Sequence, residues 1–139
     1  MFTGEYERSL DSKGRLMLPP VWRSELTVGG YLARSTSSGP KCVDLITEET
    51  MRATADRLLE GVREGRYTAD EQRRWASSLT PVQLDGQGRI VVPPTLRDHA
   101  GITGSVMLVG NLNRAEIWSI DHYSAWEETT GDDGGAVFY

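Results

Sequence analysis

The sequence predicts an α+β fold in which one β-rich module occurs twice, with helices between the copies. Residues 10–26 and 84–100 align at an offset of 74 residues, with seven identities in seventeen positions and no gap. Apolar residues recur at helical spacing between the copies and at period two around them, the latter typical of strands. The chain has 139 residues, which suits one domain or two small ones.

The first copy predicts a strand, a tight turn, a second strand and a helix. Residues 2–10 place apolar side chains on one side at period two, which indicates a half-buried strand. Asp11 can accept backbone N–H groups ahead of it, and Gly14 can adopt a positive φ, so a turn follows. Residues 16–18 form a short strand that ends at the Pro19-Pro20 pair, whose second proline suits the first turn of a helix.

The second copy repeats this design and extends it. Asp85 and Gly88 predict the same turn, and residues 90–92 predict the same short strand before Pro93-Pro94. The following helix is expected to stop at Gly101. Each copy is then followed by a strand pair, and a last helix begins near residue 121; the pairs are 31–33 with 42–46, and 106–109 with 116–120.

A helical insert separates the two copies. Apolar side chains within residues 51–62 fall on one helical face, and the glycines near its end are expected to loosen it. Thr68 and Glu71 fit a capping box, which predicts a second helix through Leu79 that Pro81 stops. We therefore divide the chain into a first module with its trailing helix at 1–66, a helix plus second module at 67–130, and a flexible tail at 131–139.

Composition excludes several classes of protein. The chain is 38% hydrophobic and 25% charged, and it contains no apolar run long enough to cross a bilayer. The first residues lack the basic and apolar segments of a secretory signal, so we expect a cytoplasmic location. A single cysteine, Cys42, cannot form an internal disulfide, and His99 and His122 lie too far apart for a common zinc motif. We expect no enzyme activity, metal, cofactor or small-molecule substrate.

Charge is unevenly distributed along the chain. The net charge is −5, yet residues 115–139 hold six acidic residues and no Lys or Arg. The rest of the chain is nearly neutral, and its residues 8–23 carry four basic side chains against one acidic side chain. Thirteen of the fifteen basic residues are Arg, whose planar fork suits phosphate and guanine edges. Because residues 8–23 are locally basic, the negative net charge does not exclude a nucleic-acid partner.

The motifs in combination resemble the MraZ family of bacterial transcriptional regulators. The resemblance covers nearly the whole chain. It rests on Met1-Phe2-x-Gly4, Leu10-Asp11-Ser12-Lys13-Gly14-Arg15-Leu16 with Pro19 and Arg23, Asp85-x-x-Gly88-Arg89-Ile90, Leu96-Arg97-x-His99-Ala100-Gly101-Ile102, Val106-Met107-Leu108-Val109-Gly110 and Glu116-Ile117-Trp118.

The resemblance implies a fold and a function. The fold would be two tandem AbrB-like swapped-hairpin modules that form a pseudo-twofold β-barrel, with helices between them. The function would be sequence-specific binding to direct repeats in double-stranded DNA, upstream of the division and cell-wall gene cluster, usually as a repressor. The resemblance also implies self-association into a ring homo-oligomer and a place at the nucleoid.

The family's DNA-contacting loops map onto both copies of the repeat. Arg15 and Arg89 are interpreted either as DNA readers or as ion partners of their own loop Asp, whereas turn geometry alone explains the Asp and Gly positions. Arg23 and Arg97 suit a structural ion pair or a subunit contact better than DNA contact. The expected DNA-binding residues are Asp11, Ser12, Lys13, Gly14 and Arg15 in the first copy and Asp85, Gln87, Gly88 and Arg89 in the second.

Two other classes of function stay open. The acidic balance would also suit an oligomeric protein-interaction scaffold that does not bind DNA. A third alternative is an enzyme on a related β framework, for which a ligand or metal beside Cys42 or His99 would be the sign.

Overall fold

The computed structural model describes residues 1–130 and 137–139. Most of the segment expected to be a flexible tail therefore lies outside the described residues. Along the chain the elements are β1 (Glu5–Ser9), β2 (Arg15–Met17), α1 (Pro20–Arg23), the 3₁₀ turn η1 (Ser24–Leu26), β3 (Gly30–Arg34), β4 (Val43–Ile46), α2 (Glu48–Arg63), α3 (Ala69–Ser78), β5 (Thr80–Val82), β6 (Arg89–Val91), α4 (Pro94–Ala100), β7 (Ser105–Asn111), β8 (Arg114–Ser119) and α5 (Ile120–Thr130).

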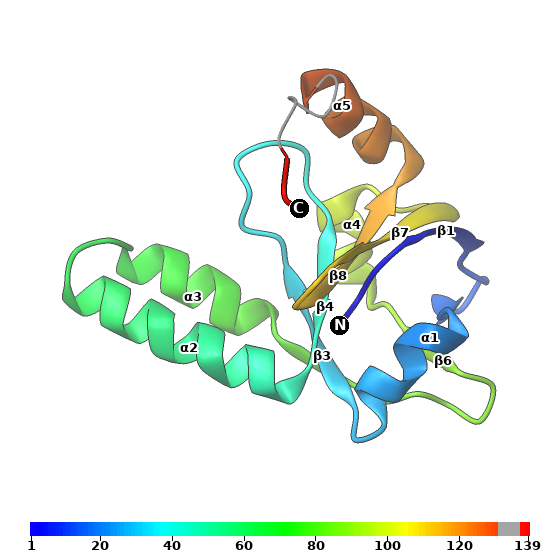
Figure 1. Cartoon of the computed structure of the whole chain (residues 1–139), viewed down its shortest axis with the longest axis horizontal. Coiled ribbons are helices and arrows are strands. Elements are labelled where there is room, and N and C mark those ends of the chain that lie inside the picture. The colour runs from blue at the N-terminus through cyan, green and yellow to red at the C-terminus, as the bar shows by residue number, and fades with distance from the viewer. Residues whose placement is uncertain (131–136) are drawn as a thin grey trace.

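A six-stranded antiparallel sheet combines strands from both halves of the chain. Its order is β1-β7-β8-β4-β3-β5, so β1 of the first copy pairs with β7 of the second. The two expected strand pairs form, as β3 with β4 and as β7 with β8, and β4 joins them through β8. Figure 1 shows the α2–α3 hairpin extending from one side of this sheet, while α1 and β6 lie on the other side.

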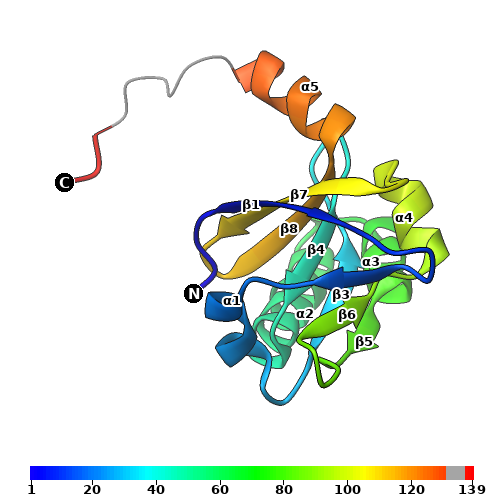
Figure 2. The same cartoon turned by 90° about the vertical axis from the view of Figure 1, so that its right-hand side faces the viewer.

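A two-stranded antiparallel ribbon, β2 with β6, forms the second sheet (Figure 2). Its register pairs Leu16 with Ile90, and both side chains are buried. Beyond the strands, the Leu18 N–H donates to the Gly88 carbonyl at 3.1 Å and the Val92 N–H to the Gly14 carbonyl at 2.9 Å. The first strand of each copy after its turn therefore pairs with its counterpart in the other copy.

The expected closed β-barrel is not formed by the strands of residues 1–130, which make two separate sheets. The ribbon strands are three residues long. Pro19 and Pro93 lie two residues beyond the ends of these strands, and proline has no N–H with which to extend the ladder. The α+β class itself is confirmed.

The main core lies between the ribbon and the large sheet, and Trp22 is at its centre. The Trp22 side chain is fully buried, and its Nε1 donates to the Thr3 carbonyl at 2.9 Å. Phe2 and Tyr6 each contact the indole edge to face, with ring centroids 5.6 Å away. One aromatic residue of α1 thus holds β1 and the amino terminus against that helix.

The helical hairpin forms largely as predicted. Thr68 and Glu71 make the full capping box at the start of α3, and Trp75 of α3 packs against the sheet. Gly61 lies two residues before the end of α2 and is buried. A Cβ at this position would collide with the Tyr67 ring, so the glycine admits the aromatic side chain that follows the helix.

The second helix ends before Pro81, as predicted, but Pro81 itself lies in a strand that was not predicted. Thr80–Val82 form β5, which pairs only with β3 at the edge of the sheet. Proline is tolerated at such an edge because its missing N–H faces no partner strand. Within the described residues, no helix is both long and apolar enough to cross a membrane.

Replacing Trp22 by Ala should lower the free energy of unfolding by about 3–5 kcal/mol, because it opens a cavity in the main core. Urea unfolding followed by circular dichroism measures this loss. Val28, whose side chain is 85% exposed, provides the control, and Val28→Ala should stay within about 0.5 kcal/mol of the parent. Equal losses in the two variants would contradict the assigned core.

Candidate nucleic-acid interface

Two loops of the same backbone geometry precede the ribbon strands; we name residues 11–14 loop 1 and residues 85–88 loop 2. In loop 1, Asp11 Oδ1 accepts the N–H groups of Lys13 and Arg15, both at 2.9 Å. In loop 2, the side chain of Asp85 accepts the N–H groups two and four residues ahead of it, again both at 2.9 Å. The aspartates therefore organise the backbone of the turns, as the sequence predicts.

Glycine is required in both loops. Gly14 and Gly88 each have φ of +78°, which L side chains rarely adopt. A Cβ at Gly14 would also lie 2.9 Å from the carbonyl oxygen of Val92. The ribbon and the turns consequently depend on each other, since the same glycine makes the turn and accepts the cross-copy hydrogen bond.

Each loop aspartate also holds the arginine that begins the adjoining strand. Arg15 Nε donates to Asp11 Oδ2 at 2.5 Å, and Arg89 Nε donates to Asp85 Oδ2 at 2.8 Å. The ion-pair interpretation of these arginines is therefore confirmed. Each pair uses only Nε, and no acceptor within residues 1–130 or 137–139 takes the terminal amino groups. The guanidinium groups are held in place with two donor nitrogens each still available.

The loop carboxylates stay ionised far into the acid range. The pKa of Asp11 falls from its usual 3.8 to about 2, chiefly because its carboxylate accepts the Arg15 backbone N–H. The pKa of Asp85 is lowered in the same way, first by the Arg89 backbone N–H. At neutral pH each loop therefore contains a fixed anion that positions a fixed cation.

The outer face of the ribbon carries four side chains of mixed character. Leu16 and Ile90 point inward, so their neighbours Arg15, Met17, Arg89 and Val91 alternate to the outer face. The register pairs Arg15 with Val91 and Met17 with Arg89. Met17 is 37% and Val91 51% exposed. Because the strands are antiparallel, loop 1 and loop 2 lie at opposite ends of this face.

The loop tips differ only in their side chains. Lys13 and Ser12 are exposed at the tip of loop 1, while Gln87 and Gly86 occupy the same positions in loop 2. No carboxylate among the described residues pairs with the Lys13 ammonium group. The structure thus brings the nine expected residues onto one ribbon, at two separate ends.

Arg23 and Arg97 have a role that the sequence did not predict. Arg23 Nε and Nη2 donate to the Leu18 carbonyl at 3.1 and 2.9 Å, and its guanidinium lies against Gly88. Arg97 lies against Gly14 in the equivalent way. Neither arginine forms an ion pair within the described part of the chain, so the ion-pair alternative is wrong, while the subunit contact stays a prediction. Each helix arginine instead supports the loop of the other copy; their identity at the repeat offset was the available signal.

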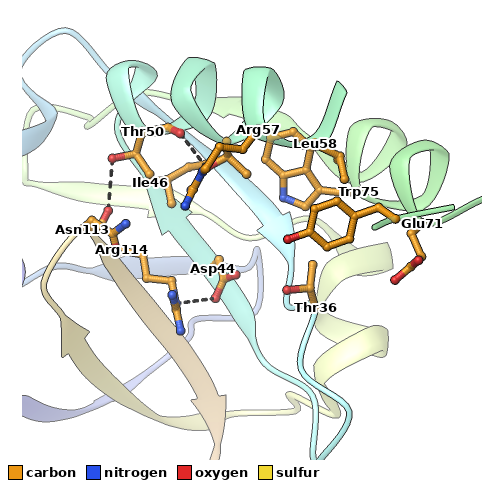
Figure 3. Close-up of a pocket in the computed structure, with 12 residues that line it drawn as sticks. Thr36, Asp44, Ile46, Thr50, Arg57, Leu58, Glu71, Trp75, Asn113 and Arg114 are labelled. Atoms are coloured by element: carbon orange, nitrogen blue, oxygen red, sulfur yellow. Dashed lines mark hydrogen bonds and ion pairs between the residues drawn. The ribbon is translucent and has the colours of Figure 1, made fainter. Parts of the chain in front are cut away.

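A hollow of about 310 Å³ lies away from the ribbon, between the α2–α3 hairpin and strands β4 and β8 (Figure 3). Arg114 points into it, and its Nε lies 3.8 Å from Asp44 and 3.0 Å from Glu116. Burial is the main cause that raises the pKa of Asp44 to about 7, and burial also raises the pKa of the Cys42 thiol.

This hollow offers little chemistry of the enzymatic kind. Ligand atoms of Cys42, Asp44 and Glu116 lie within 4.8 Å of one another, close enough to share a metal ion. The guanidinium of Arg114 already pairs with both carboxylates, however, and the Cys42 thiol stays protonated at neutral pH. A protonated thiol is neither a nucleophile nor a good metal ligand.

Replacing Gly14 by Ala should lower the free energy of unfolding by about 1–3 kcal/mol, because a side chain is strained at this positive φ. Gly86→Ala is the matched control in the other loop. A Cβ at Gly86 would meet no atom within 4 Å, and the φ of Gly86 is not positive, so this change should stay within about 0.5 kcal/mol. Thermal unfolding of both variants measures the difference, and equal effects would contradict the assigned turn.

The stabilising effect of Asp11 should disappear in acid. Because its pKa is about 2 in the folded protein and 3.8 ordinarily, its contribution is fully present above pH 3.8 and is lost as the pH falls toward 2. Urea midpoints of the parent and of Asp11→Asn should therefore differ at neutral pH and converge over this interval. A gap that persists unchanged at pH 2 would show that the Asp11 charge does not stabilise the loop.

Comparison with known proteins identifies the family of the chain. The family model described as "MraZ protein, putative antitoxin-like" matches residues 1–36 and 77–133. A protein named "Transcriptional regulator MraZ" from Alcanivorax borkumensis is 33% identical, over 94% of this chain and 89% of its own length. Proteins of the same name from Alkaliphilus metalliredigens and Azotobacter vinelandii are each 34% identical, over 92% and 99% of this chain and 87% and 90% of their own lengths.

These relatives are named as regulators and not as enzymes, which confirms the expectation that no enzyme is involved. The matched segments include both loops, both ribbon strands and the helix arginines that support them. The chain belongs to the MraZ family of transcriptional regulators.

Proposed function

We propose that the protein is a sequence-specific DNA-binding regulator that represses the division and cell-wall gene cluster. One observation carries this proposal: Arg15 and Arg89 are each held through Nε by a loop aspartate, and no other described residue takes their terminal amino groups on the outer face of the ribbon. The residues that contact or shape the contact with DNA are Asp11, Ser12, Lys13, Gly14, Arg15, Asp85, Gln87, Gly88 and Arg89.

The ribbon suits the major groove of double-stranded DNA, which admits a two-stranded β-ribbon. Arg15 and Arg89 would direct their free nitrogens to guanine edges, the commonest specific contact of arginine. Met17 and Val91, exposed beside them, would contact thymine methyl groups. Lys13 at the loop tip would bind a phosphate, which positions the protein without reading sequence.

The distribution of charge supports this surface over others. Three arginines of the α2–α3 hairpin pair with acidic residues close in the sequence, namely Arg52 with Glu48, Arg63 with Glu60 and Arg73 with Asp70. Much of the positive charge of the hairpin is therefore neutralised locally. Lys13, Arg23 and Arg97 pair with no carboxylate in the described residues, which leaves uncompensated positive charge at both ends of the ribbon.

The assembly would multiply a weak contact. One ribbon offers few phosphate contacts, so we propose a ring homo-oligomer that aligns several ribbons along spaced direct repeats. The pairing of β2 with β6 across the two copies supports a swapped-hairpin arrangement of modules 1–66 and 67–130. We place the protein in the cytoplasm, at the nucleoid.

The variant Lys13→Ala with Arg15→Ala should fail to retard the DNA upstream of the protein's own gene, at concentrations where the parent does so. It removes one phosphate contact and one base contact from every subunit of the ring. The matched control is Arg63→Ala with Arg73→Ala, which removes two charges from the helical hairpin and should leave retardation intact. Light scattering should give the same mass for all three proteins.

The parent should also lose affinity steeply as salt rises, because bound phosphates release counterions. Retardation by the loop variant equal to that of the parent would refute the assignment of the loops. A parent ring that ignores this DNA even at low salt would favour the scaffold function instead.

A further inference from the structure

We infer that the ribbon binds DNA in one orientation only, because its two ends share one backbone geometry but differ in charge at the loop tips, where loop 1 has Lys13 and loop 2 has the neutral Gln87. This inference rests on the proposed function and goes beyond it. A single orientation means that each subunit recognises a DNA site without twofold symmetry, although the two loops and the ribbon are themselves nearly twofold symmetric.

The backbone gives no basis for orientation. The hydrogen bonds from backbone N–H groups to the loop aspartates are all 2.9 Å, and Gly14 and Gly88 have the same φ of +78°. The cross-copy bonds to the two glycine carbonyls are 2.9 and 3.1 Å. A DNA duplex that met only this scaffold and the two fixed arginines would bind either way round.

The loop tips remove this symmetry. Loop 1 presents the Ser12 hydroxyl and the Lys13 ammonium group, whereas loop 2 presents Gly86 and the neutral Gln87 amide. All four residues are exposed, so the difference lies at the surface and not in the core. Phosphate contacts set the orientation of a protein on a duplex, and only the loop 1 end carries the extra cation.

The supporting arginines increase the difference. Arg23, beside loop 2, uses Nε and Nη2 on the Leu18 carbonyl. Arg97, beside loop 1, makes no side-chain hydrogen bond to the described residues, and its buried Nε has no partner there. The two helix arginines carry the same charge, but Arg97 has both terminal amino groups unbonded among the described residues, whereas Arg23 uses Nη2. The end that already holds Lys13 therefore also has more donors for a phosphate.

The chain offers matched positions at which to test the orientation. Val21 on α1 and Thr95 on α4 are equivalent in the two copies and both are exposed. α1 lies by loop 2 and α4 by loop 1, because their arginines contact those loops. The natural cysteine, Cys42, is buried at 1% exposure, so a thiol reagent would label Val21→Cys or Thr95→Cys selectively.

An iron–EDTA reagent tethered to each cysteine would cleave the DNA nearest to it. The probe is a duplex with a single site, which the parent protein has enriched from a random-sequence pool. Val21→Cys should cut one flank of the site and Thr95→Cys the other, each with a bias of roughly tenfold over the opposite flank. The variant Gly86→Ser with Gln87→Lys, which gives loop 2 the sequence of loop 1, should reduce this bias to about threefold or less.

The matched control changes the same two positions without adding charge. Gly86→Ser with Gln87→Asn should keep the bias of the parent. If Val21→Cys and Thr95→Cys, with both loops otherwise unchanged, each cut the two flanks equally, the single orientation would be overturned while the proposed function stayed intact. A bias unchanged by Gly86→Ser with Gln87→Lys would overturn the role of Lys13. A parent that enriches no duplex at low salt would overturn the proposed function and this inference together.

Discussion

The pairing of β2 with β6 is the interaction on which the rest of the structure depends. It buries Leu16 against Ile90 and continues into the carbonyls of the two loop glycines. Because the paired strands come from different copies of the repeat, neither copy can form the ribbon alone. The ribbon and its outer face therefore form only when both copies meet, and the core residue Trp22 secures β1 to the same unit.

The loop aspartates link folding to recognition. One carboxylate oxygen of Asp11 shapes the turn, and the other restrains Arg15. A long arginine side chain normally loses conformational entropy when it binds, and prior restraint reduces that loss. The Asp11 carboxylate bonds only to Nε of Arg15, so the two terminal amino groups of the guanidinium stay available. Asp85 and Arg89 reproduce this arrangement at the other end of the ribbon.

Net charge is a poor guide to the surface of this protein. The overall −5 arises from acidic residues that are spread along the helices and gathered in the carboxyl-terminal part of the chain. On α2 and α3, three of the five arginines pair with acidic residues three or four positions away. Such exposed pairs stabilise little, but they reduce the positive potential on that side. The ribbon side keeps Lys13, Arg23 and Arg97 without such partners in the described residues, so a negatively charged protein can still offer a local site for an anion.

Features encoded within a few neighbouring residues could be predicted from the sequence. The Asp11 and Gly14 turn, the Thr68 and Glu71 capping box and the helix that stops at Gly101 are of this kind, because each depends on local hydrogen bonds and allowed φ values. The repeat also predicted that both copies contain the same turn. Tertiary structure alone decided that β2 pairs with β6 across the copies, that Arg23 and Arg97 support the opposite loop, and that Pro81 lies in an edge strand. These outcomes depend on which distant apolar faces can be buried together, and no local pattern of residues specifies that choice.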